Sequence, residues 1–274
     1  GQARISVAVF PGLSLGGGGQ NPPVEPVTCS PMPHTEQVEP DVHSSSEAYA
    51  NRFRGPLGEY LLDVQARGFE RLIQPWRGGT VLDVGGGHAQ LAPMLLSQDM
   101  TLTIQGSSAA CRERPDRVIG RESYDFLEAS LLNLPVADRS FDVVVCARII
   151  AHVPEPSRFL AELCRVARHA VIVDYPDRSG FNRFSRMLFG CKSWVEQRTT
   201  RPFAYFDRRE IEAWLGQAGF APDAHVGQFF WPVALHRLIG RAGTTRLLEQ
   251  LAWRLGLTRR LGSPVILRAL RADD

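Results

Sequence analysis

The chain has 274 residues, 44% of them hydrophobic and 22% charged, with a formal net charge of +2. This composition is typical of a globular protein and excludes a disordered, collagen-like or coiled-coil chain. No apolar run approaches the ~18 residues that a membrane-spanning helix needs. The charge is divided unevenly, because residues 1–174 hold 15 basic and 20 acidic side chains while residues 175–274 hold 16 and 9. We therefore expect the two parts to contact different molecules.

Residues 1–46 are predicted to form a flexible tail. They contain seven prolines, a glycine run at 16–19 and three serines at 44–46, with little apolar periodicity. Such a stretch cannot bury enough surface to offset the entropy cost of ordering. The apolar stretch ISVAVF is too short for a secretion signal. Five scattered cysteines without C-x-x-C spacing indicate a reducing compartment, so we expect a cytoplasmic protein without a zinc or other metal site.

From residue 47 onward the sequence predicts alternating helices and strands. Serines suited to an N-cap precede Glu47, and apolar residues at helical spacing continue towards Pro75, which ends the helical pattern. Strands are predicted at 80–84 and 101–105, in a short segment near 124–129, and at 140–147, 169–176 and 263–270, with helices at 91–96, 156–167 and 207–220 and mainly helical chain from 232 to 262. This alternation predicts an α/β domain over 47–274 with a parallel, helix-covered sheet.

A glycine-rich turn, VLDVGGGHA at 81–89, follows the first predicted strand. Glycines let the backbone approach a ligand, and open parallel sheets bind ligands beyond the carboxyl ends of their strands. A dinucleotide fingerprint would need glycine where Gln90 stands, and a G-K-[ST] phosphate loop is absent from the sequence. Asp83 would repel a phosphate but suit a cationic amino group, which favours a zwitterionic nucleoside such as S-adenosylmethionine. A tight turn without a ligand is the alternative.

Further motifs follow this turn in a fixed order: NLPVADRSFDVVVCARIIAHVPEP at 133–156, FLAELCRVAR at 159–168 and YFDRREIEAWLGQAGF at 205–220. Together they resemble the class I S-adenosylmethionine-dependent methyltransferases, most closely the type 11 small-molecule group. The resemblance is close over 49–174 and looser over 204–222. It implies a Rossmann-like, doubly wound sheet of seven mostly parallel strands with helical cap insertions. It also implies S-adenosylmethionine as cofactor and methyl transfer to a small-molecule acceptor by in-line displacement.

The resemblance further implies which residues contact the cofactor. They are Tyr49, Arg54, Asp83, Gly85, Gly86, Gly87, Gln105, Ser130, Leu131 and Ala147. Gln105 and Ser130 depart from the family pattern, in which an acidic residue usually binds the ribose hydroxyls and Asp is common at the second position. Because neutral side chains are weaker acceptors, a catalytically silent methyltransferase-like binding protein is an alternative, in which restoring Asp at 105 would raise affinity. A dehydrogenase-type nucleotide binder is disfavoured by Gln90 and Asp83.

Candidate residues for the acceptor side lie after the later strands. Methyl transfer depends chiefly on alignment, so the absence of a clear catalytic triad in the sequence is no objection. His152 is the candidate general base, and a capping or packing histidine is the alternative. Candidate substrate contacts are Arg148, Tyr175, Tyr205 and His236.

Two segments, 176–203 and 231–262, are predicted to form cap or substrate elements. Both interleave aromatic and apolar residues with basic ones. They would form a lid over an apolar or anionic acceptor, a face for peripheral contact with a membrane, or helices that simply pack on the sheet. The sequence lacks a recognised nucleic-acid-binding module, which disfavours nucleic acid as a partner, and it does not indicate an oligomeric state.

Overall fold

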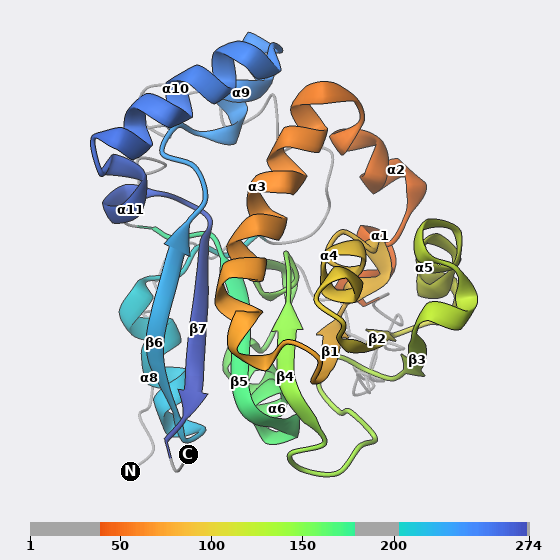
Figure 1. The fold of residues 1–274 in the computed structure, drawn as a ribbon. Coiled ribbons are helices and arrows are strands. Elements are labelled where there is room, and N and C mark those ends of the chain that lie inside the picture. The colour runs from red at the N-terminus through yellow and green to blue at the C-terminus, as the bar shows by residue number, and fades with distance from the viewer. Residues whose placement is uncertain (1–38, 179–202, 273–274) are drawn as a thin grey trace, which may run out of the picture. The chain divides into compact units, whose positions relative to one another are not determined.

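The computed structural model describes residues 39–178 and 203–272 (Figure 1). The strands are β1 (Thr80–Val84), β2 (Thr101–Gly106), β3 (Asp125–Glu128), β4 (Phe141–Cys146), β5 (Ala167–Tyr175), β6 (Phe220–Gly227) and β7 (Val265–Arg271). The α-helices are α1 (Pro40–Ser44), α2 (Glu47–Ala50), α3 (Gly55–Ile73), α4 (Ala92–Ser97), α5 (Glu113–Ile119), α6 (Pro156–Val166), α8 (Arg208–Gln217), α9 (Val233–Ile239), α10 (Ala242–Arg254) and α11 (Leu257–Leu261). Short 3₁₀ turns include η1 (Asn51–Phe53), η3 (Gly86–His88) and η6 (Ile150–His152).

The seven strands form one sheet in the order β3-β2-β1-β4-β5-β7-β6. All neighbouring pairs from β3 to β5 are parallel, and β7 runs antiparallel between β5 and β6. The predicted α/β class and the mostly parallel, Rossmann-like sheet are therefore confirmed. The strand order reverses between β1 and β4, and such a switch point is where open α/β sheets bind ligands.

One strand, β6, was not among the segments predicted from the sequence. Its segment, FAPDAHVG, carries Pro222 and Asp223, which are both unfavourable in a strand. The register with β7 shifts between Pro222 and Ala224, so the proline sits at an irregularity of an edge strand, where the lost N–H is tolerated.

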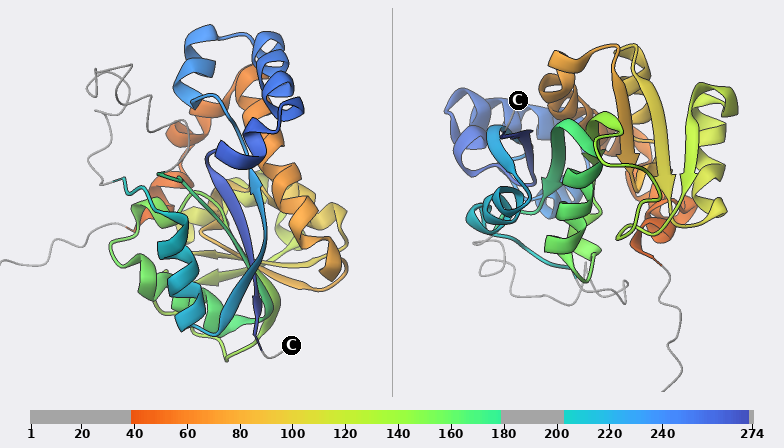
Figure 2. Two further views of the ribbon diagram at one scale, coloured as in Figure 1. Left: turned by 90° about the vertical axis from the view of Figure 1, so that its left-hand side faces the viewer. Right: turned by 90° about the horizontal axis from the view of Figure 1, so that it is seen from below.

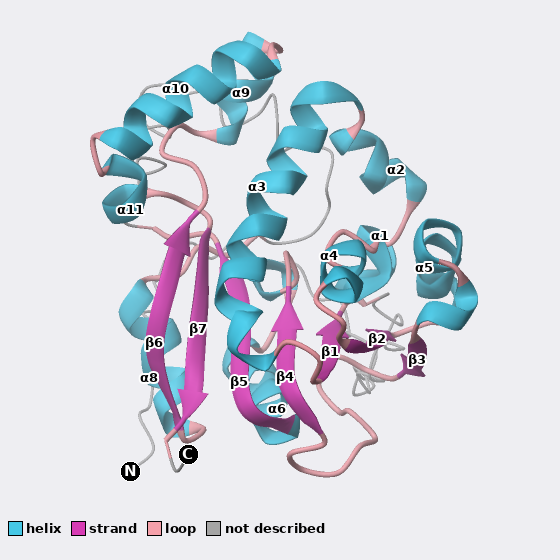
Figure 3. Ribbon diagram, viewed as in Figure 1, coloured by secondary structure: helices cyan, strands magenta, loops and turns pink. Residues whose placement is uncertain are grey.

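Helices cover both faces of the sheet (Figure 3). Along each strand, alternate residues point to opposite faces. Val81 and Val143 join the core under α3 and α4, whereas Leu82 and Val144 join the core under α6 and α8. The same alternation places Asp83 on the α3 side of the sheet.

The folded region begins earlier than the sequence predicted. Residues 40–44 form α1, inside the segment predicted to be a flexible tail up to residue 46. Pro40 suits the first turn of a helix, and the hydroxyls of Ser44 and Ser45 both donate to the carbonyl of Asp41. The tail boundary was therefore placed too late, because local hydrogen bonds and burial of Asp41 order a sequence that lacks apolar periodicity.

The two predicted cap segments differ in what can be described. Residues 179–202, most of the segment 176–203, lie outside the described residues. The mainly helical chain predicted from 232 to 262 is confirmed as α9–α11, which stand beside the amino-terminal half of α3 (Figure 2). Within the described ranges, no helix is both long and apolar enough to cross a bilayer.

Candidate active site

The glycine turn after β1 needs bare backbone at two positions. Gly85 has φ +70°, and a Cβ there would lie 2.5 Å from the Cγ1 of Ile149. A Cβ on Gly87 would lie 2.0 Å from the Oγ of Ser45 and 2.8 Å from the carbonyl oxygen of Cys111. Real Cβ atoms do not approach neighbours this closely, so any side chain at these positions would displace the elements packed on the turn. The turn is therefore shaped for close approach of other groups to its backbone.

Asp83 is the second-last residue of β1, at the end that leads into the glycine turn, and it is almost fully buried, at 2% exposure. Burial alone raises the pKa of its carboxyl to about 7. Desolvation is the cause of this shift, because burial penalises the charged form of the carboxyl. An ammonium group brought next to it would stabilise the ionised form. The residues of the turn thus fit a cationic, phosphate-free ligand such as the methionine portion of S-adenosylmethionine.

Gln105, at the end of β2, uses its side-chain amide inside the protein. Its Oε1 accepts from the Gly85 N–H at 2.9 Å, and its Nε2 donates to the Ala129 carbonyl at 2.6 Å. The residue is fully buried. These bonds tie the turn after β1 to β2 and to the chain after β3, which is a structural task. As a ribose contact Gln105 remains a prediction, and the geometry does not favour it.

Helix α1 places a carboxylate beside the end of β2. Asp41 is fully buried and accepts from the Ser107 N–H and from the Ser107 hydroxyl, both at 2.6 Å. Its Cβ lies 3.5 Å from the position that a Cβ on Gly85 would take. Glu39, just before the helix, accepts from the hydroxyl of Ser130 at 2.7 Å. Two carboxylates from this segment therefore lie next to the two positions, 105 and 130, where the sequence lacks acidic residues.

The loop after β4 is held by a second buried carboxylate. Arg148 has φ +65°, a backbone conformation that residues other than glycine rarely adopt. Its N–H donates to the Oδ1 of Asp174 at 2.5 Å, and the Oδ2 of Asp174 accepts from Gln65 of α3 at 2.5 Å. Burial raises the pKa of Asp174, and the bonds from Arg148, Gln228 and Gln65 oppose that shift. Asp174 thus holds the strained backbone of Arg148 in place, and so it fixes the point from which the guanidinium side chain extends.

Three arginines and two aromatic residues lie close together near the loop after β4. We call them the arginine cluster: Arg52, Arg148, Arg237, Tyr49 and Phe53. Arg148 lies 4.2 Å and Arg237 6.0 Å from the ring centroid of Phe53, and Arg52 lies 5.3 Å from that of Tyr49. The Nη1 atom of Arg148 is buried and has no hydrogen-bond partner in the part of the chain that the structure describes. Desolvation and the like charges of Arg52 and Arg148 lower the pKa of Arg237. Within residues 39–178 and 203–272, none of the three arginines forms an ion pair.

His88, the residue after the three glycines, lies against the arginine cluster. Its ring makes edge contacts with Tyr49 and Phe53 at centroid distances of 5.5 and 5.9 Å. Both ring nitrogens are buried, and neither has a hydrogen-bond partner among residues 39–178 and 203–272. Burial and the charges of Arg148 and Arg114 lower its pKa to about 3, so His88 is neutral at physiological pH.

Two predicted substrate contacts lie in the interior instead. Tyr175 is fully buried among the apolar residues on the α6 and α8 side of the sheet, because it alternates with Asp174 and points to the other face. His236 is fully buried, and its Nε2 lies 2.9 Å from the Oε1 of Glu249. This burial within the described residues does not favour substrate contact by either side chain, and both assignments remain predictions.

The remaining predicted residues surround the site. His152 lies in η6 after β4 and makes an edge contact with Phe203 at 5.3 Å, and Phe203 contacts Tyr205 at 5.1 Å. Leu131 packs in the core, Ala147 is buried after β4, and Arg54 is exposed at the start of α3.

The sequence did not point to the acidic residues in and just before α1, or to three residues that lie around Phe53. Asp41 and Glu39 were assigned to the tail, and His88, Arg52 and Arg237 received no role. A signal existed only for His88, which stands inside the glycine motif. The others are joined by tertiary contacts that no local pattern reveals.

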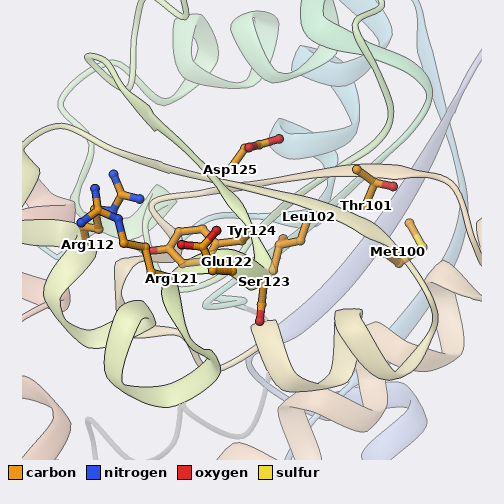
Figure 4. A pocket seen from close by; sticks show the side chains of 9 residues that line it. All are labelled: Met100, Thr101, Leu102, Arg112, Arg121, Glu122, Ser123, Tyr124 and Asp125. Atoms are coloured by element: carbon orange, nitrogen blue, oxygen red, sulfur yellow. The ribbon is translucent and has the colours of Figure 1, made fainter.

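A cavity of about 390 Å³ lies elsewhere on the molecule (Figure 4). Met100–Leu102 at the start of β2 and Arg121–Asp125 before and at the start of β3 line it, together with Arg112. Apart from Arg112, which follows the carboxyl end of β2, these residues lie at the amino ends of β2 and β3, at the opposite edge of the sheet from the glycine turn. The cavity is therefore not part of the candidate active site.

Known proteins resemble this chain in sequence and in fold. Residues 82–173 match the type 11 family model, which describes a methyltransferase domain. The demethylmenaquinone methyltransferase of Clavibacter sepedonicus is 25% identical over 191 residues, covering 63% of this chain and 78% of that protein. An uncharacterized methyltransferase of Mycobacterium sp. strain JLS is 32% identical over 118 residues, covering 43% of this chain and 46% of that protein.

Among solved structures, magnesium protoporphyrin IX methyltransferase from Synechocystis PCC 6803 with bound SAH superimposes with a TM-score of 0.58 at 14% identity. The match covers 84% of this chain and 96% of that chain. At this identity the likeness shows the fold, which is the methyltransferase type of Rossmann-like sheet.

The sheet topology and the glycine turn after β1 define a Rossmann-like α/β domain of the methyltransferase type. Residues 82–173 match a methyltransferase-domain model, so the chain resembles the class I S-adenosylmethionine-dependent methyltransferases, as the sequence motifs predicted. It is an enzyme, and S-adenosylmethionine is its cofactor. The alternatives of a silent binding protein and of a dehydrogenase-type nucleotide binder are not retained.

Proposed function

We propose that this methyltransferase acts on a small organic acceptor that carries a negative charge. The observation that supports this acceptor class is the arginine cluster, in which three guanidinium groups lack an ion-pair partner among the described residues. A buried guanidinium nitrogen without a partner, such as the Nη1 of Arg148, is costly unless a ligand supplies an acceptor. A carboxylate or an ionised hydroxyl would supply that acceptor in the planar geometry that arginine prefers.

The aromatic residues of the cluster favour an acceptor with an apolar body. Phe53 and Tyr49 present ring faces to the guanidinium groups, and His88 is neutral and buried beside them. Two relatives have names that give small-molecule chemistry: the demethylmenaquinone methyltransferase, and the ubiquinone biosynthesis O-methyltransferase of Azorhizobium caulinodans, which is 25% identical over 186 residues. An apolar body that bears an ionisable oxygen fits both the rings and the arginines.

The cofactor residues in the proposal come from both the sequence and the structure. Asp83 would pair with the ammonium group of S-adenosylmethionine, and Gly85–Gly87 would allow close approach of its methionine portion. Asp41 would accept from the ribose hydroxyls in place of Gln105, because a carboxylate offers about four acceptor sites and, among the described residues, Ser107 and the thiol of Cys111 are the donors to it. Tyr49, Arg54, Ser130, Leu131 and Ala147 remain cofactor contacts by resemblance.

Bound S-adenosylmethionine supplies an activated methyl group, so the chain's own task is alignment of the acceptor. Arg148, fixed by Asp174, and Arg237, on α9, would hold the acceptor anion from two sides of Phe53. His152 is the candidate base that would take a proton from an acceptor hydroxyl. An acceptor that is already ionised by the arginine cluster would not need this base.

A methyl-transfer assay with matched acceptor pairs tests the acceptor class. Each pair consists of an aromatic acid and its neutral amide, with methylated product detected by mass spectrometry. We expect product from acids, and we expect Arg237→Gln to raise KM roughly tenfold through loss of a charged hydrogen bond. Arg246→Gln is the matched control, since Arg246 is an exposed arginine of the neighbouring helix that lies over Tyr60. Equal methylation of acids and amides would contradict the proposal.

A further inference from the structure

The helices α9–α11 carry an unusual concentration of exposed apolar side chains. Eight large apolar residues are exposed among the described residues, and six of them fall between 238 and 261. They are Leu238, Leu247, Leu251, Trp253, Leu255 and Leu261, with exposures of 41–77%. Among them, Leu247, Leu251 and Leu255 recur at every fourth position along α10, and we call these three the leucine surface. Soluble proteins rarely expose large side chains in such a concentrated group unless the group contacts another molecule.

The exposure of the leucines on α10 follows from where they lie around the helix. Leu247, Leu251 and Leu255 recur at every fourth position and so line one side. The opposite side, with Thr245 and Glu249, is buried. The helix therefore turns polar residues inward and leucines outward, the reverse of an ordinary surface helix.

Hydrogen bonds to Glu249 fix the buried side of α10, so the outward direction of its leucines is set by the structure. Glu249 accepts from the N–H groups of Phe230 and Trp231, both at 3.0 Å, and contacts the Nε2 of His236 at 2.9 Å. These bonds fix which side of α10 faces α9 and the preceding loop. Rotating the helix to hide its leucines would leave a buried carboxylate and three buried donors without partners, which is strongly unfavourable.

Charge decides what covers the leucine surface. The segment 232–262 contains six arginines, at 237, 241, 246, 254, 259 and 260, and all are exposed. Its single acidic residue is the buried Glu249. A second copy that used the same surface would bring arginines against arginines, which opposes self-association. An anionic lipid surface instead offers apolar depth for the leucines and negative headgroups for the arginines.

We infer that α9–α11 bind peripherally to an anionic membrane surface through the leucine surface. The same helices border the active site, because Arg237 of α9 also belongs to the arginine cluster. Figure 2 shows these helices, in blue, beside α3 and beyond the sheet. A surface-bound enzyme would thus meet amphiphilic anions at the interface. The inference itself stands on the surface alone and does not depend on the proposed acceptor class.

Vesicle co-sedimentation of the full chain tests the inference. We expect binding to vesicles that contain phosphatidylglycerol, little binding to phosphatidylcholine alone, and weakening by salt. Replacing Leu247, Leu251 and Leu255 together by Gln should weaken binding roughly tenfold or more. Val118→Gln is the matched control, because Val118 is an exposed apolar residue on α5, and it should leave binding unchanged.

Three results would overturn the inference. One is absence of binding to phosphatidylglycerol vesicles, and another is equal binding by the triple variant when its circular dichroism and melting temperature match those of the parent chain. The third is a dimer in light scattering that the triple variant converts to a monomer, since that would assign the leucine surface to a second copy. None of these measurements uses methyl transfer, so they remain separable from the test of the acceptor.

Discussion

Replacing Asp41 by Asn tests whether helix α1 contributes a ribose acceptor. The substitution retains a carbonyl oxygen for the Ser107 N–H and an NH₂ group that the Ser107 hydroxyl can accept from, so the contacts of α1 survive. What is lost is the charge and one acceptor oxygen. A hydrogen bond to a charged group contributes about 1.5–3 kcal/mol, which corresponds to a roughly 10- to 150-fold rise in Kd.

Titration calorimetry with SAH and with its 2′-deoxy and 3′-deoxy analogues measures this effect. We expect Asp41→Asn to weaken binding of SAH but to leave binding of the analogue that lacks the contacted hydroxyl nearly unchanged. Glu47→Gln is the control, because Glu47 pairs with Arg114 and Arg117 on the surface near the same helix.

Two outcomes would refute the assignment of Asp41. Equal weakening of SAH and of both deoxy analogues would mean that Asp41 only holds α1 in place. Tighter binding of every ligand would mean that α1 must leave the glycine turn before the cofactor binds.

Other consequences can be measured on the ligand-free protein. Since the pKa of Asp83 is raised from 3.8 to about 7, the native state holds the proton more tightly than the unfolded chain; stability is full below about pH 4 and is lost as pH rises through 7. Urea unfolding should therefore show Asp83→Asn gaining up to about 4 kcal/mol over the parent chain at pH 8 and nothing at pH 4, and a pH-independent difference would contradict this. Gln105→Asp should lower stability by about 1–3 kcal/mol and fail to improve SAH affinity, because the donor to Ala129 is lost; a gain in affinity would show that the position does bind ribose. Glu249→Ala should cost about 3–5 kcal/mol in the same assay by leaving buried donors unpaired, with exposed Glu212→Ala as a milder control.

Much of the fold could be predicted because its signals are local. Five parallel strands follow from β-branched runs and helix alternation, and the glycine turn marks the end of β1. Strand β6 escaped because Pro222 and Asp223 obscure its pattern, and its pairing with β7 is a tertiary fact. Helix α1 escaped because its order comes from the contacts of Asp41, not from any apolar repeat.

The site was only partly predictable for the same reason. Asp83 stands inside a motif, so its role could be inferred from sequence. Tyr175 and Asp174 are adjacent, and a prediction that treats both as cleft residues ignores the alternation that sends one of them into the core. Arg237 lies over the ring of Phe53, although most of the domain separates these residues along the chain. No rule based on sequence spacing could predict that contact.

The place of β7 in the sheet has a consequence for how the chain is made. β7 pairs with β5 on one side and β6 on the other, yet it follows both of them along the chain and leaves the ribosome after them. Until residues 265–271 emerge, both β5 and β6 present an open edge with unpaired backbone groups. The nascent protein therefore pairs β5 and β6 with their common neighbour only after residues 265–271 have emerged. We expect the cofactor half to be assembled before the opposite half of the sheet can close.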